Sequence, residues 1–216
     1  MILPRSIKNR LSYFGLEFKP GVKRRFYLRR MLRRVSKMEG DIVECGVGKM
    51  VTFQMFATYL QNNNSSRKLW GFDSFEGFPE PTPEDVSPRN PQKGEWKVIE
   101  EDDVAKFLLI QGFDSQWISS QIKTIKGFFK DTLPADDVSQ IALLHLDVDL
   151  YDSYKTCLEH LFPKVVPGGV VLFDEYKHES DSYKFPGAQK AIDEYFSGTN
   201  YEISRDWFSG KYYLIK

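Results

Sequence analysis

The stretch Asp41-Ile42-Val43-Glu44-Cys45-Gly46-Val47-Gly48 decides the fold that we expect for this chain. Its first five residues predict a short strand, and the two glycines predict a tight turn after it. A helix is predicted directly after this turn, over residues 49–62. Glycines at such a turn let a ligand approach the backbone and the N-terminus of the helix. A turn without any ligand can have the same pattern, so a ligand site at this turn needs further support from the sequence on both sides.

Strand and helix patterns alternate along the rest of the chain. Further strands are predicted over 68–73, 122–126, 141–147 and 170–173, helices over 22–38, 100–111, 151–165 and 187–196, and a closing hairpin over 201–204 and 211–215. The buried strands are continuous apolar runs, which is typical of a parallel sheet covered on both faces. We therefore expect an α/β fold, with a doubly wound, mostly parallel sheet, an antiparallel C-terminal hairpin and helices on both faces. Ligands of such sheets bind beyond the carboxyl ends of the strands.

The composition fits one globular domain. The 216 residues are enough for a single core and short for two, and apolar and charged residues make up 41% and 28% of them. No run approaches the ~20 apolar residues of a membrane span. Basic residues stand at the start of the chain, where a signal peptide needs an apolar stretch. Cys45 and Cys157 are too few for a disulfide framework or a zinc site, so a reducing cytoplasm is the expected location.

Charge divides the chain unevenly. Residues 1–40 hold 12 Lys/Arg against two acidic residues, a net charge of +10, so the rest, with 18 against 28, carries −10. We predict a basic helical N-terminal extension over 1–40 and the main domain over 41–216, with the proline-rich segment 74–98 as a lid. The favoured role of the basic helix is to pack on the acidic body and support a homodimer. An anionic membrane surface is an alternative partner, and nucleic acid is a weaker one because no aromatic-stacking motif or zinc knuckle accompanies the basic residues.

Two features predict a cofactor that contains a nucleoside. A dinucleotide fingerprint needs a third glycine at position 51, where this chain has Val51, so the turn does not suit NAD. Asp73 ends the second predicted strand, 27 residues after Gly46, and a carboxylate there can accept hydrogen bonds from both ribose hydroxyls. The alternative role of Asp73 is to cap the turn that follows it.

Five ordered blocks extend this pattern, namely Glu44–Val47, Gly71–Pro79, Gly127–Pro134, Leu146–Tyr151 and Pro167–Tyr176. With these blocks the chain resembles a class I S-adenosylmethionine-dependent methyltransferase, and more closely the macrocin O-methyltransferase family, which methylates sugar hydroxyls. The resemblance spans positions 41–176, about two thirds of the chain, and its most distinctive part is Asp73-Ser74-Phe75-Glu76-Gly77-Phe78-Pro79. It implies a Rossmann-like form of the sheet, S-adenosylmethionine as the methyl donor, and a magnesium ion.

The resemblance also implies roles for single residues. The cofactor would be bound by Glu44, Gly46 and Gly48 around its methionine part, by Asp73 and Ser74 at the ribose, by Phe128 and Phe129 beside the adenine, and by Asp147. The magnesium ligands would be Asp147, Asp174 and Glu175. The chain departs from the family pattern twice. Lys49-Met50 follows the glycine turn where the family has another small residue, and Asp174-Glu175 replaces an Asp-Asp pair, which leaves a metal-free site open.

The carboxylates support part of this interpretation through their own chemistry. Asp147, Asp149, Asp174 and Glu175 stand at or just beyond two strand ends that the fold makes neighbours. Oxygen ligands in this number suit Mg²⁺ or Ca²⁺ and not zinc. Without a cation they would repel one another and raise some pKa values, so that one could act as a general base. The alternative is a solvated acidic rim balanced by lysines, for which the candidates are Lys155, Lys164 and Lys177.

We predict catalytic roles for Asp147, Asp174, Asp149 and His178, and we expect His145, in its apolar strand, to be a core residue. A sulfonium is already an activated methyl donor, so the protein needs only to align an acceptor oxygen and remove its proton. The predicted function is O-methylation of a hydroxyl on a sugar-containing substrate. The alternatives are a catechol or phenol O-methyltransferase, which the same metal arrangement would serve, and a non-catalytic or RNA-associated module that keeps the fold.

Overall fold

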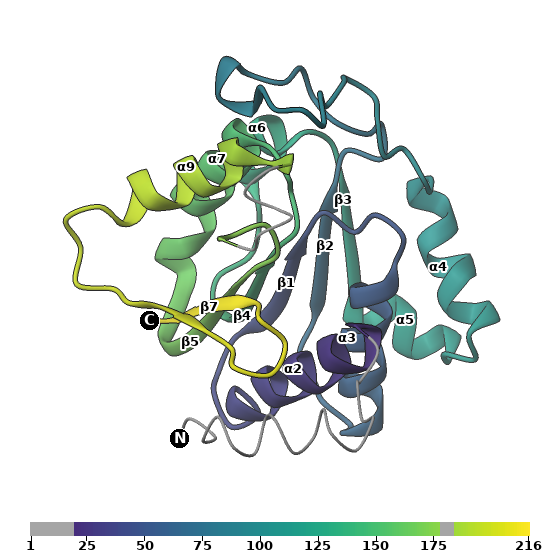
Figure 1. The fold of residues 1–216 in the computed structure, drawn as a ribbon. Helices are drawn as coiled ribbons and strands as arrows, with labels where there is room; N and C mark the ends of the chain where they lie inside the picture. The colour runs from purple at the N-terminus through teal and green to yellow at the C-terminus, as the bar shows by residue number, and fades with distance from the viewer. Residues whose placement is uncertain (1–19, 178–183) are drawn as a thin grey trace, which may run out of the picture.

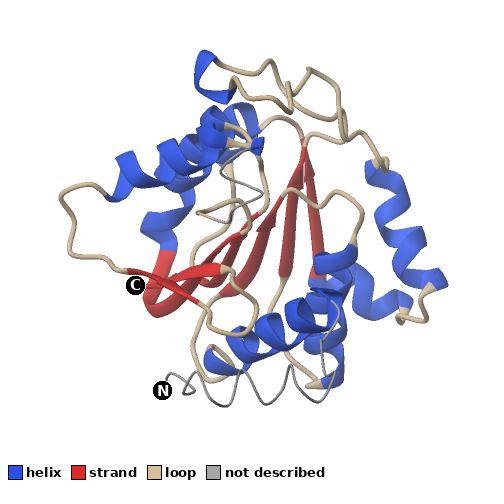
Figure 2. Ribbon diagram, viewed as in Figure 1, coloured by secondary structure: helices blue, strands red, loops and turns tan. Residues whose placement is uncertain are grey.

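The computed structural model describes residues 20–177 and 184–216, which form an α/β fold around one sheet (Figures 1 and 2). Its strands are β1 (Asp41–Cys45), β2 (Leu69–Asp73), β3 (Ile122–Lys126), β4 (Ile141–Leu146), β5 (Val165–Phe173), β6 (Ile203–Arg205) and β7 (Tyr212–Ile215). Their order across the sheet is β3-β2-β1-β4-β5-β7-β6. The strands β1 to β5 are parallel, and β7 pairs antiparallel with both β5 and β6. The predicted sheet and its C-terminal hairpin are therefore confirmed.

The strand order fixes where a ligand can bind. From β1 the chain moves outward to β2 and β3, then returns to the other side of β1 with β4 and β5. The helices after β1 and β4 therefore leave on opposite faces, and a ligand site is expected beyond the carboxyl ends of these two strands. Residues 46 and 147, which follow β1 and β4, lie at these strand ends.

Helices cover both faces of the sheet (Figure 1). One face carries α2 (Pro20–Arg34), α3 (Val51–Asn62), α4 (Glu101–Ile110) and α5 (Ser115–Gln121), and the other carries α6 (Phe129–Thr132), α7 (Tyr151–Leu161) and α9 (Pro186–Phe196). Three short 3₁₀ turns are η1 (Pro83–Asp85), η2 (Leu133–Ala135) and η3 (Phe162–Lys164). Successive strand residues alternate between two cores, since Ile42 packs with the first group of helices and Val43 with the second. This double burial explains why the strands read as unbroken apolar runs.

Several elements differ from the sequence prediction; among them, helix α6 was not predicted and helix α7 ends at Leu161, short of the predicted residue 165. The helix α5 was not predicted, because only Ile118 of it is fully buried and no apolar period marks it, although Asp114 caps it by accepting from the Trp117 N–H at 2.8 Å. Strand β5 begins at Val165 and includes the predicted Pro-Gly-Gly turn, since Lys216 pairs with the backbone of Gly168 and Gly169. The basic helix ends at Arg34, short of the predicted residue 38.

The basic helix α2 is firmly attached to the sheet domain. Four side chains of α2, and that of the residue directly after it, are buried in the core beside α3: Tyr27, Leu28, Met31, Leu32 and Val35. The Tyr27 hydroxyl donates to the Tyr212 carbonyl at 3.1 Å, and Arg30 forms an ion pair with the buried Asp206. Residues 1–19 lie outside the described part of the chain, so the division at residue 40 stays a prediction.

The proline-rich segment 74–98 is a loop across the carboxyl ends of the strands (Figure 2). It is tied together by Phe78, which exchanges backbone hydrogen bonds with Gly94 and Glu95 at 2.9 and 2.8 Å. Asp85 is buried and accepts from the Tyr151 N–H at 2.8 Å, which joins the loop to the start of α7. Among the described residues, no helix has the length and apolar character needed to cross a bilayer.

Candidate active site

A cavity of about 630 Å³ opens at the carboxyl ends of β1 and β4, below the proline-rich loop. All the predicted site residues that the structure describes line it: Glu44, Gly46, Gly48, Asp73, Ser74, Phe128, Phe129, Asp147, Asp149, Asp174 and Glu175. The predicted catalytic residue His178 lies outside the described residues. Sequence positions far apart in the chain therefore meet in one cavity, with the glycine turn on one side and the carboxylates on the other.

Hydrogen bonds to Asp73 fix the conformation of the glycine turn. One carboxylate oxygen of Asp73 accepts from the N–H groups of Val47 and Gly48 at 2.9 and 3.0 Å, and the other accepts from Phe75 N–H at 2.8 Å. Gly46 has φ +85°, and a Cβ there would collide with the carbonyl oxygen of Asp147. The turn therefore needs glycine at this position to bring β1 and β4 together. Through Phe75, Asp73 caps the turn that follows it, as the alternative prediction had it, and it also holds the glycine turn and lines the cavity.

Met50 marks the first departure from the family pattern. It begins α3 with φ 66°, a left-handed conformation that favours glycine, and its side chain is fully buried. Burial of the Met50 side chain in the core next to α2 offsets the strain of this backbone conformation. The turn thus keeps its shape without the small residue that the family has there.

Glu44 and His145 form a buried pair at the base of the cavity. His145 Nδ1 lies 3.0 Å from Glu44 Oε1, while Glu44 Oε2 is buried with no hydrogen-bond partner among the described residues. Burial raises the pKa of Glu44 well above its usual range, and the nearby Asp147 raises it further. Burial also lowers the pKa of His145 to about 3, so this histidine is neutral at neutral pH. His145 is a core residue, as predicted, but it also supports a cavity-lining carboxyl.

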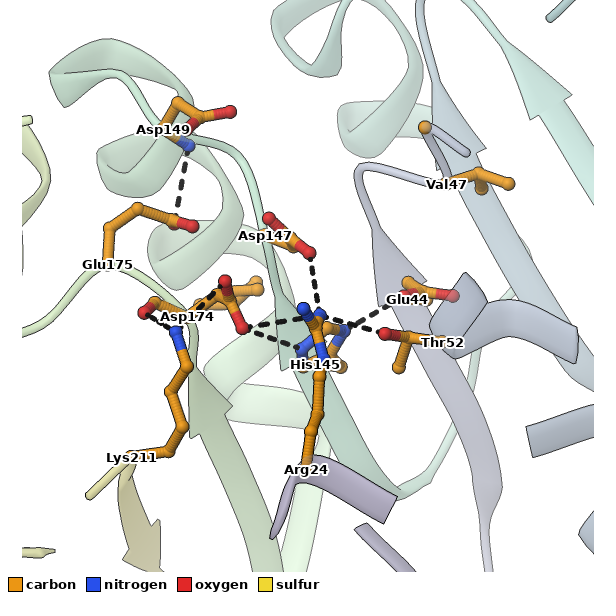
Figure 3. A network of polar contacts seen from close by, with 12 residues as sticks. Arg24, Glu44, Val47, Thr52, His145, Asp147, Asp149, Asp174, Glu175 and Lys211 are labelled. Atoms are coloured by element: carbon orange, nitrogen blue, oxygen red, sulfur yellow. Dashed lines mark hydrogen bonds and ion pairs between the residues drawn. The ribbon is translucent and has the colours of Figure 1, made fainter. Parts of the chain in front are cut away.

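Two cations, Arg24 and Lys211, lie against Asp147 and Asp174 at the ends of β4 and β5 (Figure 3). Arg24 extends from α2 and places its Nη2 atom 3.1 Å from Asp147 Oδ2 and 3.3 Å from Asp174 Oδ1. The same Nη2 donates to Thr52 Oγ1 at 2.8 Å. Lys211 Nζ contacts Asp174 Oδ2 at 3.1 Å and donates to the carbonyl of the same residue at 2.7 Å. Both carboxylate oxygens of Asp174 are therefore paired with positive charge.

The two aspartates consequently differ in acidity. Burial alone would raise the pKa of Asp174, but Arg24 and Lys211 outweigh it and lower this pKa to about 2. Burial, followed by the charge of Asp174, raises the pKa of Asp147 to about 6. Asp174 is therefore a permanent anion near neutral pH, whereas Asp147 can take up a proton close to the working range of a general base.

Glu175 faces away from the two cations. It is buried, and its Oε2 atom accepts from the Tyr154 hydroxyl at 2.6 Å and lies 3.4 Å from the Asp149 N–H. Burial raises the pKa of Glu175 well above its usual range, and Asp147 and Asp149 raise it further. Figure 3 shows Glu175 directed toward Asp149, above Asp174. The side chain of Glu175, one methylene longer than that of an aspartate, thus reaches the Tyr154 hydroxyl and accepts a hydrogen bond from it.

This arrangement changes the set of residues that could hold a metal ion. The described residues that bring ligand atoms within 4.8 Å of one another are His145, Asp147 and Asp174, so His145 replaces the predicted Glu175. The Arg24 guanidinium contacts both aspartates of that set. With Arg24 in this position the group does not fit a divalent cation, because the facing oxygens already accept from the guanidinium and a second positive charge would be repelled.

The cations of the site were not predicted from the sequence. Two of the lysines proposed to balance the carboxylates pair elsewhere, Lys164 with Asp136 and Lys177 with Asp193, and Lys155 lies over the Tyr151 ring. Arg24 is one of six arginines in the basic helix, and the sequence pattern does not distinguish it from the other five. The available signal was the opposite net charge of residues 1–40 and 41–216, which is compatible with a contact between the basic helix and the carboxylates.

One family model matches residues 20–200, and its description is Macrocin-O-methyltransferase (TylF). The chain belongs to the macrocin O-methyltransferase family. The match includes the basic helix α2 as well as the sheet, and it confirms the resemblance found in the sequence blocks.

Curated relatives of this family member are O-methyltransferases by name, and the name of one of them includes a rhamnosyl group. The 8-demethyl-8-(2,3-dimethoxy-alpha-L-rhamnosyl)-tetracenomycin-C 4'-O-methyltransferase of Streptomyces olivaceus is 35% identical over 143 residues, which cover 63% of this chain and 53% of the relative. Demethyldecarbamoylnovobiocin O-methyltransferase of Streptomyces niveus is 29% identical over 182 residues, covering 81% and 66%. This macrocin O-methyltransferase family member thus spans between about half and two thirds of the length of these relatives.

Solved structures agree with the fold. The O-methyltransferase NovP superposes with a TM-score of 0.75 at 27% identity, covering 90% of this chain and 80% of that one. The calicheamicin methyltransferase CalS11 superposes with a TM-score of 0.77 at 24% identity, covering 99% and 86%, and supports the fold alone. The Rossmann-like methyltransferase fold is therefore confirmed for this macrocin O-methyltransferase family member.

Proposed function

We propose that this chain transfers a methyl group from S-adenosylmethionine to a hydroxyl of a sugar, on a glycan or a glycosylated small molecule. Membership of the macrocin O-methyltransferase family, together with the rhamnosyl group in the name of one relative, supports this activity. The observation that carries it is the cavity itself, which joins the glycine turn and Asp73 to Asp147 in one space. A donor bound at the turn would present its methyl group toward that carboxylate.

The residues of the β1–β2 side fit S-adenosylmethionine. Glu44 Oε2 is a buried acceptor with no partner among the described residues, which suits the ammonium group of the methionine part. Gly48 lines the cavity with no atom within 4 Å of the position of a Cβ, so a ligand can approach its backbone. Asp73, with Ser74 beside it, has further lone pairs for the ribose hydroxyls, and Phe128 and Phe129 offer rings to the adenine.

Asp147 is the proposed general base. The acceptor hydroxyl gives its proton to the Asp147 carboxylate while its oxygen bonds to the methyl carbon, and the carbon–sulfur bond breaks with its electrons going to sulfur. The products are a methyl ether, S-adenosylhomocysteine and a protonated Asp147. The pKa of about 6 at Asp147 suits this task, whereas the pKa of about 2 at Asp174 makes that residue a weak base. Asp149, which also lines the cavity, is proposed to position the acceptor.

The homodimer and the cytoplasm stay predictions, whereas the residues present do not fit the predicted magnesium ion. The contacts of Arg24 and Lys211 with Asp147 and Asp174 do not favour a magnesium ion, so no step of the proposed reaction passes through one. The exposed side of α2, which includes Arg25 and Arg29, is the proposed surface for a homodimer. The free, buried thiols of Cys45 and Cys157 are compatible with a reducing cytoplasm, which we retain as the proposed location.

Ligand-induced stabilisation tests the cofactor. We expect S-adenosylhomocysteine to raise the melting temperature in proportion to RT ln(1 + [L]/Kd), and we expect NAD to leave it unchanged. Isothermal titration calorimetry gives the stoichiometry, which should be one cofactor per chain. A protein that responds to neither ligand, while its circular dichroism spectrum shows an intact fold, would contradict the proposed function and favour a non-catalytic module.

A further inference from the structure

Arg24 is a charged residue of the cavity to which the proposed reaction assigns no role. It belongs to α2, 123 residues before Asp147 in the sequence, yet its side chain reaches the ends of β4 and β5. Only 31% of that side chain is exposed, and one atom, Nη2, contacts Asp147, Asp174 and Thr52 together. Figure 3 shows the guanidinium directed into the space between the two aspartates and His145.

The guanidinium lies where a divalent cation would have to bind. Asp147 Oδ2 and Asp174 Oδ1 are the facing oxygens of the pair, and both are within 3.3 Å of Arg24 Nη2. Magnesium bonds to its oxygen ligands at about 2.0–2.1 Å and prefers six of them in an octahedron. It could not use these two oxygens without displacing the arginine.

Two further oxygens of the cluster are also engaged. Asp174 Oδ2 pairs with Lys211, and Glu175 Oε2 accepts from Tyr154. Cations and hydrogen-bond donors of the chain itself therefore compensate the repulsion among these carboxylates. Because a guanidinium keeps its charge at every physiological pH, this compensation does not depend on an added ion.

The position of Arg24 is fixed from several sides. Thr52 on α3 orients the guanidinium through the 2.8 Å hydrogen bond of its hydroxyl oxygen. The helix that carries Arg24 is anchored by Tyr27 on Tyr212 and by Arg30 on Asp206. These anchors place Arg24 in the site independently of any ligand, as expected for a built-in part of it and not for a mobile surface side chain.

We propose that Arg24 is the resident cation of this site, a positioning residue that holds Asp147 and Asp174 in place of a divalent metal ion. Methyl transfer by this chain then proceeds without added metal, a consequence that rests on the proposed function. The exclusion of metal by Arg24 does not rest on it, so it can be tested on the protein alone.

Binding of Mn²⁺, followed by electron paramagnetic resonance of the free ion, tests the exclusion directly. The wild-type chain and the control Arg25→Gln, an exposed neighbour on the same helix, should bind no Mn²⁺ at millimolar concentration. Arg24→Gln leaves the aspartates without this cation, and we expect it to bind Mn²⁺ about tenfold or more tightly than the wild type. Arg24→Lys keeps the charge and should restore the exclusion. Circular dichroism of each variant verifies that it is folded.

Activity with a glycoside acceptor supplies the second readout. The wild type should keep its full rate after exhaustive chelation. The rate of Arg24→Gln should be about 10- to 100-fold lower than that of the wild type, and part of this rate should return when Mg²⁺ is added. Wild-type protein that binds Mn²⁺ as tightly as Arg24→Gln, or that loses its activity with the chelator, would overturn the proposal. Failure of the proposed function is distinct, because it would abolish binding of S-adenosylhomocysteine and leave the Mn²⁺ result unaffected.

Discussion

Backbone amides organise the β1–β2 side of the cavity, whereas charged side chains organise the β4–β5 side. On the first side, Asp73 accepts from the N–H groups of Val47 and Gly48, residues 26 and 25 positions away in the chain. On the second side, Asp147 depends on Arg24, 123 positions away, and Asp174 on Lys211, 37 positions away. The cofactor side is thus one local unit, and the carboxylate side is assembled from the two ends of the chain.

This difference separates binding from chemistry. A local unit of strand, turn and strand end can keep its shape when charges elsewhere are altered. The carboxylate side depends on charge balance, because removing one partner leaves a buried charge uncompensated. We therefore expect substitutions on the two sides to give different signatures, with cofactor binding affected on the first and rate or pH dependence on the second.

Asp147→Asn should have the largest effect, on rate alone. The amide cannot accept the acceptor proton, so kcat should fall about 10²- to 10⁴-fold, the usual contribution of a general base. The Kd for S-adenosylhomocysteine should change little, because Asp73 and the glycine turn are untouched. Steady-state kinetics and calorimetry on the same preparation measure both quantities. A variant that retains most of its rate would assign the base to another residue, for which Asp149 is the next candidate.

Asp73→Ala should have the next largest effect, on cofactor binding. It removes the acceptor of three backbone N–H groups, at a cost of about 1–3 kcal/mol per unsatisfied buried group, and we expect the Kd for S-adenosylhomocysteine to rise by about 10- to 100-fold. The matched control is Asp114→Ala, which removes a comparable cap from α5, outside the cavity. That control should lower the melting temperature and leave the Kd unchanged. Equal Kd values in the two variants would contradict a role of Asp73 in cofactor binding.

The pH profile of kcat/KM separates the two aspartates. The pKa of Asp147 in the free protein is raised to about 6, so its basic form is lost as the pH falls through 6, and kcat/KM should drop about tenfold per unit below that value. Asp174, with a pKa of about 2, stays ionised over this range and should add no second limb. A single acidic limb near 6 is therefore expected. A flat profile between pH 5 and 8, measured with a buffer series of constant ionic strength, would contradict the assignment of Asp147.

Trp96→Ala should have the smallest effect, at the mouth of the cavity. Lys49 from the glycine turn lies 4.8 Å from the centroid of the Trp96 ring, so this contact joins the turn to the proline-rich loop. A cation–π contact at an exposed site contributes about 0.5–1 kcal/mol, and we expect KM for the acceptor to rise about two- to fivefold. Trp207→Ala, an exposed tryptophan in the turn between β6 and β7, is the control and should leave KM unchanged.

The same comparison explains how far sequence reasoning could reach. The strands, the glycine turn, Asp73 and the carboxylates at the strand ends could be predicted because each is marked by residues close together in the chain. Arg24 could not be distinguished from the five other arginines in its helix, since which one reaches the cavity depends on how α2 docks. Glu175 was assigned to a metal by position, but the hydroxyl of Tyr154, 21 residues earlier, holds it elsewhere.

The most direct test of the account is methyl transfer to a panel of acceptors, followed by mass spectrometry with the chelator present throughout. The panel should contain deoxysugar glycosides, their aglycones and a catechol, with S-adenosylmethionine as the donor. We predict that a glycoside gains one methyl group on a sugar hydroxyl, with one S-adenosylhomocysteine formed for each methyl transferred, and that its aglycone and the catechol gain none. Methylation of the catechol alone, or of the aglycone and glycoside equally, would contradict the assignment of a sugar hydroxyl as the acceptor.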